Sequence, residues 1–172
     1  MRRLLIVLCV LSLAACGGSE ETATPSGFAT LHGDGWTLAY PSSWEVSEVD
    51  GSRLAQGPKG AGGLAPQAAV ARDPKPPPFE VSLKAFKADQ TLRRGNYEVT
   101  RDAAFDLAGA ADARVIEADY VEKTAGGTTP VRTVDLLVRT DDGEQLDFLL
   151  RAPQADFDRV RLDEVLDTIR LH

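Results

Sequence analysis

The chain has 172 residues, with 19 Lys and Arg against 26 Asp and Glu, and its net charge at pH 7 is −7. This length suits one domain with its own core, and the acidic balance argues against nucleic acid as a partner, because phosphates need Lys and Arg to neutralise them. Cys9 and Cys16 are the two cysteines and both lie near the start, so the rest of the chain offers no disulfide and no thiolate metal site.

The first residues have the pattern of an export signal. Arg2 and Arg3 precede an apolar run over residues 4–13, and the small residues Ala14 and Ala15 follow it. A bilayer span needs roughly 20 apolar residues, whereas the apolar part of a secretory signal has about 7–15. The run therefore predicts a cleaved signal and not a membrane span.

The segment Leu13-Ala14-Ala15-Cys16 resembles the lipobox of bacterial lipoproteins. The resemblance implies a signal peptide over residues 1–15, cleavage before Cys16, and diacylglyceryl and palmitate-type chains on that Cys. Two or three acyl chains hold a protein firmly. We therefore expect Cys16 to anchor the protein on the extracytoplasmic side of the cell membrane, or on an outer membrane where the source has two. The alternative is an ordinary secretory signal with a Cys nearby.

Residues 16–27 are small, polar and rich in Gly and Ser, which is typical of a flexible tether. We expect a single globular domain over residues 28–172. Residues 36–40 and 44–49 alternate between apolar and polar, with Pro41 between them, and this predicts two strands in a hairpin-like pair. A Gly-rich loop over 57–63 and a weakly strand-like segment over 64–71 follow.

A Pro-rich connector over residues 73–78 leads to a predicted helix over 79–92, because Phe79, Leu83 and Phe86 fall on one helical face. Further strands are predicted over 97–100, 104–107, 114–121, 131–139 and 144–151. A final helix is predicted over 154–170, where Leu162, Val165, Leu166 and Ile169 have helical spacing.

Strands joined by short loops, with helices between and after them, indicate an α+β fold with a largely antiparallel sheet. Leu137 and Leu149 point away from the main apolar face of their strands, which indicates cover on both faces of the sheet. The expected architecture is an α/β/α sandwich.

The segment Gly35-Trp36-Thr37-Leu38-Ala39-Tyr40-Pro41-Ser42-Ser43-Trp44 resembles the opening of PsbP-like domains. The segment over 107–114 and the strand that follows it resemble the family's Gly-x-x-Ala pattern, and the end of the chain resembles the family's last strand and terminal helix. The likeness covers about residues 28–172 and, together with the lipobox, points to an actinobacterial-type lipoprotein branch. It implies an α/β/α sandwich that binds other macromolecules, and it supplies no family active site.

No catalytic set is evident in the sequence, so we expect no enzyme. Past the signal, the two histidines are His32, beside the tether, and His172, the last residue, and neither is placed to serve as a rigid base. Ser42 and Ser43 lie in a turn without the Gly-x-Ser-x-Gly pattern of a nucleophile.

Two further groups of residues have both a functional and a structural interpretation. Glu117, Asp119, Asp135 and Asp147 could form a carboxylate patch for a cation such as calcium, or a solvated strand surface balanced by Arg132, Arg139 and Arg151. Trp36, Tyr40 and Trp44 could line an apolar cleft, or belong to the core.

We therefore expect a lipid-anchored, non-enzymatic envelope protein without a cofactor, whose domain binds a macromolecular partner. A carrier of a lipid or other apolar ligand around Trp36 and Trp44 is the first alternative. An enzyme acting on envelope substrates is the second.

Overall fold

The structure is a computed structural model that describes residues 24–60, 62–124 and 127–172. Cys16 and the signal segment lie outside the described residues, so the lipobox stays a prediction. No helix in the described part of the chain is long and apolar enough to cross a membrane.

The described residues form ten strands and two helices. The strands are β1 Phe28–Gly33, β2 Trp36–Pro41, β3 Glu45–Val49, β4 Ser52–Gln56, β5 Gln67–Asp73, β6 Gly95–Ala104, β7 Ala110–Thr124, β8 Gly127–Thr140, β9 Gln145–Pro153 and β10 Arg170–Leu171. The helices are α1 Phe79–Arg93 and α2 Leu162–Leu166.

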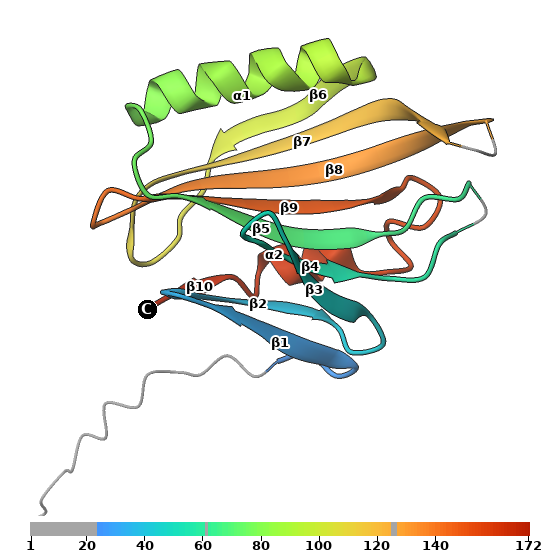
Figure 1. The fold of residues 1–172 in the computed structure, drawn as a ribbon, viewed down its shortest axis with the longest axis horizontal. Coiled ribbons are helices and arrows are strands. Elements are labelled where there is room, and N and C mark those ends of the chain that lie inside the picture. The colour runs from blue at the N-terminus through green and yellow to red at the C-terminus, as the bar shows by residue number, and fades with distance from the viewer. Residues whose placement is uncertain (1–23, 61, 125–126) are drawn as a thin grey trace, which may run out of the picture.

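The strands form two antiparallel sheets. The larger has seven strands in the order β3-β4-β5-β9-β8-β7-β6, and the smaller has three in the order β1-β2-β10. The chain is thus a mixed α+β fold, as the sequence predicts. In Figure 1 the long strands β7, β8 and β9 run through the middle of the molecule, with α1 on one side and the small sheet on the other.

Both faces of the large sheet are covered, but not in the way expected. Helix α1 covers one face, and the small sheet together with the five-residue helix α2 covers the other (Figure 1). The second outer layer is therefore mainly a sheet where a helix was predicted.

The principal core lies between the two sheets. Phe148 of β9 is fully buried, and its ring meets Trp36 of β2 edge-on, with 5.7 Å between ring centroids and 84° between planes. Leu38 of the small sheet and Ile169 after α2 are also fully buried in this core. The two sheets therefore share one apolar interior.

A smaller apolar cluster lies under α1. Leu83 of the helix packs with Ile116 of β7 and Leu137 of β8, and Phe79 and Phe86 lie against the same group. Leu137 thus confirms the expectation that the sheet is covered on its second face.

The predicted hairpin of residues 36–40 with 44–49 is wrong. Strand β2 pairs with β1 and β10, whereas β3 pairs with β4 in the other sheet. The reason is local, because Asp50 and Gly51, with φ of 51° and 76°, close a two-residue hairpin between β3 and β4. The chain crosses from one sheet to the other between Pro41 and Trp44.

Two further expectations need correction. The first of the two predicted short strands and the turn after it lie within the single strand β6, whose pairing with β7 is interrupted by register shifts. Strand β6 ends at Ala104, so most of the second predicted strand, residues 105–107, lies in the loop before β7. The predicted helix over 154–170 shortens to α2, because Arg161 has a left-handed φ of 56° and strand β10 draws the following residues onto β2. The spaced apolar residues are nevertheless buried: Leu162, Val165, Leu166 and Ile169.

Candidate functional site

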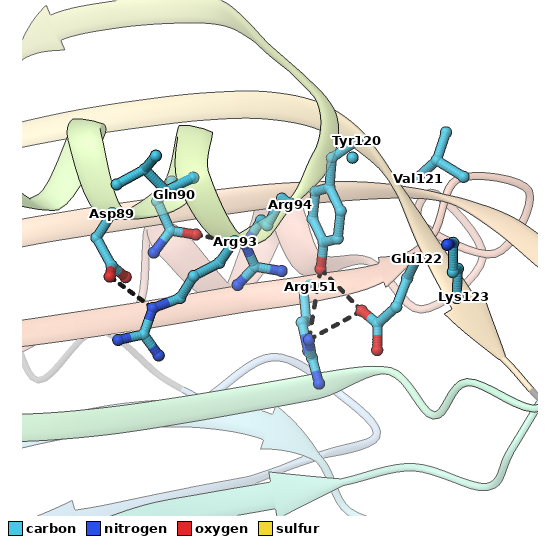
Figure 2. Close-up of a pocket in the computed structure, with 11 residues that line it drawn as sticks. Asp89, Gln90, Arg93, Arg94, Tyr120, Val121, Glu122, Lys123 and Arg151 are labelled. Carbon is cyan, nitrogen blue, oxygen red and sulfur yellow. Dashed lines mark hydrogen bonds and ion pairs between the residues drawn. The ribbon is translucent and has the colours of Figure 1, made fainter.

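A pocket of about 710 Å³ lies where α1 ends above the large sheet (Figure 2). We call it the α1-end pocket. Its lining combines basic, acidic and apolar side chains from α1, β7 and β9: Asp89, Gln90, Leu92, Arg93, Arg94, Gly95, Tyr120, Val121, Glu122, Lys123 and Arg151.

The end of α1 sets one wall of the pocket. Arg94 leaves the helix with an extended backbone, and its N–H donates to the carbonyl of Gln90. The next residues, Gly95 and Asn96, begin β6, and Asn96 adopts a φ of 52°. Arg93 and Arg94 thus stand beside the last helical carbonyls, where the helix dipole favours positive charge.

The guanidinium of Arg94 is held in place on two sides. Its Cζ lies 4.2 Å from the ring centroid of Tyr120, and its Nε donates to the side-chain carbonyl of Gln90. A cation over an aromatic face at this distance is an attractive arrangement. Figure 2 shows Arg94 beside the ring of Tyr120, which extends from β7 toward Arg151.

Arg151 of β9 forms the floor of the pocket. Its Nε donates to Oε1 of Gln67 at 2.6 Å, and its Nη1 contacts Oε2 of Glu122 at 3.2 Å and the Tyr120 hydroxyl at 3.4 Å. The contacts to Tyr120 and Glu122 appear as dashed lines in Figure 2. These partners fix Arg151, whose side chain is only 18% exposed.

The charges of the pocket do not balance. Arg93 pairs with Asp89 at 2.5 Å, and Arg151 pairs with Glu122. Within the described residues, the Arg94 side chain has no ion pair with a carboxylate, and the Lys123 side chain has neither an ion pair nor a hydrogen bond. An acidic protein therefore presents a pocket with an excess of two positive charges.

Two carboxyl groups lie buried on the same face of the sheet. Asp135 of β8 is 3% exposed and accepts a hydrogen bond from the Thr133 hydroxyl at 3.0 Å. Asp147 of β9 is half-buried as a residue, but its Oδ1 is buried without a hydrogen-bond partner in the described chain. Burial raises the pKa of both carboxyls, and the charge of Asp147 raises that of Asp135 further, while Arg94 and Arg151 oppose the rise.

Tyr97 of β6 adds a third polar group in this region. Its hydroxyl is buried without a partner among the described residues, and burial raises the pKa of Tyr97 to about 12. Its ring lies 6.5 Å from that of Tyr120. The hydroxyl therefore stays protonated and is a donor with no acceptor.

The four carboxylates considered for a cation do not come together. In the pairing of β7 with β8, Ile116 lies opposite Asp135 and Val134 lies opposite Glu117, so Glu117 and Asp135 are on different faces of the sheet. Glu117 pairs with Arg101 at 2.8 Å, and Asp119 with Arg132 at 3.3 Å. No group of three or more potential metal ligands occurs within the described ranges.

The three aromatic residues considered for a ligand cleft lie at the principal core. Trp36 and Trp44 are 4% and 7% exposed and belong to the core between the sheets, and half-buried Tyr40 packs against it. A Cβ on Gly33 would come within 2.0 Å of the Trp36 ring, which leaves room there only for glycine. Trp36 and Trp44 are thus core residues, and Trp36 also borders a surface depression of about 410 Å³ and Trp44 one of about 250 Å³.

The histidines and turn serines are not assembled into a site. His32 is exposed on β1 and borders a depression that includes Glu48 and Arg53. His172 is exposed at the end of the chain, where its N–H donates to the carbonyl of Gly35. Ser42 and Ser43 are exposed in the turn before β3.

Sequence reasoning missed the α1-end pocket because its residues are far apart in the chain. Arg94, Tyr120 and Arg151 come from three elements that only the sheet order brings together. The one local signal is the pair Arg93-Arg94 followed by Gly95, which is typical of a helix end.

Comparisons with protein-family profiles and with curated proteins give no match. Among solved structures, LpqN, described as involved in cell envelope biogenesis of Mycobacterium tuberculosis, is similar with a TM-score of 0.54 and 13% identity over 84% of this chain and 90% of its own. PA94, a Pseudomonas aeruginosa protein of unknown function, is similar with a TM-score of 0.50 and 11% identity over 81% of this chain and 92% of its own. At such identities the likeness shows the fold alone.

Proposed function

We propose that this protein is a lipid-anchored component of the cell envelope that takes part in envelope biogenesis, and that its PsbP-like domain acts by binding a macromolecular partner and not by catalysis. The lipobox at Leu13–Cys16 and the short tether support the anchoring. The fold that it shares with LpqN supports the role in the envelope.

The free edge of β3 is the observation that carries the binding role. All five residues of β3 are exposed, and among the described strands β4 is its only neighbour in the sheet. Val46 and Val49 on this strand are 43% and 51% exposed. An unpaired edge offers backbone donors and acceptors that an extended segment of a partner can complete as a further strand.

The β6 edge of the sheet is protected against pairing with a further strand, whereas the β3 edge is regular. Strand β6 carries two register shifts, and its Asp102 is tied to Lys87 of α1 and to Arg114 of β7. Bulges and charges of this kind prevent edge-to-edge pairing. The pairing of β3 with β4 has no shift from Glu45 to Val49, so this edge is the one suited to adding a strand.

The negative charge of the β3 edge favours a positively charged partner segment. Glu45, Glu48 and Asp50 lie on or directly after the strand. Within the part of the chain that the structure describes, the one ion pair among them joins Glu48 to Arg53 at a loose 3.9 Å. Two β3 edges would repel each other, because like charges face one another across paired strands. The expected partner segment is therefore extended and carries Lys or Arg.

A proline at Val46 tests this proposal. Val49 and Ser52 close the two-residue turn as a hydrogen-bonded pair, so the backbone groups of Val46 point to the free edge. Val46→Pro removes the outward N–H without removing a bond to β4, and it should abolish capture of the partner from detergent-solubilised membranes. Val46→Thr keeps the N–H and should retain capture.

The anchor is tested in the same preparations. Mass spectrometry should find acyl chains on Cys16, and Cys16→Ala should release the protein from the membrane fraction. A folded Val46→Pro protein that captures the same partners as the wild type would contradict the role of the β3 edge.

A further inference from the structure

We propose that the α1-end pocket is a binding site for a phosphate group, carried by a small envelope molecule or by a lipid headgroup. The pocket lies at the opposite edge region from β3, so this inference does not rest on the proposed partner surface. It rests on the placement of Arg94 and Lys123 in a pocket of about 710 Å³.

The Arg94 side chain is preorganised to bind an anion. The ring of Tyr120 on one side and the amide of Gln90 on the other fix its guanidinium, yet they leave its positive charge unneutralised. Arg is suited to this task, because its planar group presents several fixed N–H donors to phosphate oxygens. Little side-chain freedom remains for Arg94 to lose on binding.

Lys123 supplies the second cation from a different element. It lies on β7 and is exposed, and its side chain has no ion pair or hydrogen bond within the described residues. The end of α1 explains the charge of Arg94 in part, because helix carbonyls attract cations. It does not explain Lys123, which lines the same pocket, so an anion is the class of ligand that fits both cations.

The pocket is larger than a phosphate needs, and its rim is not uniformly polar. Leu92 lines it and is 86% exposed, and Val121 lines it from β7. Asp89 and Glu122 are engaged by Arg93 and Arg151, so their charges do not stand free against an anion. A phosphate ester with an organic group fits this combination better than a bare ion.

Two parallel titrations test the site with the acylated protein in neutral detergent micelles. Inorganic phosphate is added in one, and phosphatidylglycerol in the other, with phosphatidylcholine as the zwitterionic lipid control. The amide resonance of Gly95, which lines the pocket, reports binding. A shift with phosphate identifies a free phosphate site, and a shift with phosphatidylglycerol alone identifies a headgroup site.

Lys123→Gln should weaken either response by about tenfold, as loss of one good ionic contact does. Lys84→Gln is the matched control, since Lys84 is exposed on α1 and outside the pocket lining. The proposal is overturned if neither titration shifts Gly95, or if the two variants weaken binding equally. Capture of a partner through β3 is unaffected by these results.

Discussion

At the scale of single residues, the two carboxyl groups buried on the α1 side of the large sheet are unfavourable to ionise. The Asp135 carboxylate accepts a hydrogen bond from Thr133, and Asp147 has a buried oxygen without a hydrogen-bond partner among the described residues. A buried carboxyl resists ionisation because the charged form loses its hydration. The charged groups that face Asp135 are Asp147 and Arg151 of β9 and Arg94 at the end of α1.

This arrangement makes stability depend on pH. The pKa of Asp135 is raised in the folded state, so the folded protein holds a proton that the unfolded chain releases near its usual pKa of about 4. Stability is full below that value and falls as pH rises through the higher pKa of the folded state. Asp135→Asn should therefore be more stable than the wild type at pH 8 by on the order of 1–3 kcal/mol, and equal to it at pH 4.

Urea denaturation at several pH values measures this difference, with Asp141→Asn in the exposed turn before β9 as the control. The difference between Asp135→Asn and the wild type isolates this carboxyl from other titrating groups such as Asp102, whose pKa is lowered by Arg114 and Lys87. Parallel pH curves for the two proteins would contradict this, because they would mean that Asp135 has the same pKa in the folded and the unfolded state.

The sequence indicated this burial only indirectly. Leu137 lies two residues after Asp135 and shares its face, and its apolar side chain predicted cover there. The aspartates, taken by themselves, predict that this face of the strands is exposed to solvent. Whether Asp135 is buried or exposed depends on where α1 crosses the strands, and that position cannot be predicted from periodicity or composition.

At the scale of elements, α1 is held to the sheet by few side chains. Only Ser82 and Leu83 of its 15 residues are buried. Leu83 packs on Ile116 and Leu137, and the ion pair of Lys87 with Asp102 adds a contact at the surface. A helix with so small a buried face depends on that face for its stability, because isolated helices of this length are marginal.

Leu83→Ala should therefore loosen α1 selectively. The loss of buried contacts is expected to cost about 2–3 kcal/mol, as for other Leu to Ala changes in cores. Hydrogen exchange should accelerate in α1 while β8 and β9 stay protected. Val81→Ala, at a side chain that is 51% exposed, should leave exchange unchanged. Uniform acceleration across the sheet would contradict a separately held helix.

The elements also show where sequence prediction succeeds. The helical spacing of Phe79, Leu83 and Phe86 gave α1 within a residue of its observed bounds, and the long central strands were found by their alternation. The Asp50-Gly51 turn was overlooked, although this dipeptide is a strong hairpin signal. The helix predicted over 154–170 was too long. Its apolar spacing fits a helix, whereas the pairing of β10 with β2 joins residues far apart in the chain.

At the scale of the whole molecule, the two sheets are joined through one core. Trp36 from the small sheet meets Phe148 from the large one, and Ala39 N–H donates to the Thr168 hydroxyl that follows α2. No local pattern in the chain predicts which strands form which sheet. The order β3-β4-β5-β9-β8-β7-β6 mixes early and late segments, so the α1-end pocket was equally hidden.

A shared core predicts a single unfolding transition. Phe148→Leu removes the ring that meets Trp36 and should cost about 1–2 kcal/mol, with a changed near-ultraviolet circular dichroism signal in the folded state. Leu137→Val, on the opposite face of the large sheet, should cost about 1 kcal/mol and leave that signal unchanged. In both variants, tryptophan fluorescence and far-ultraviolet circular dichroism should follow the same denaturation curve, because Trp36 and Trp44 belong to the core that both sheets share. If fluorescence changes at lower urea than circular dichroism, the small sheet separates first, and the two sheets are not one cooperative unit.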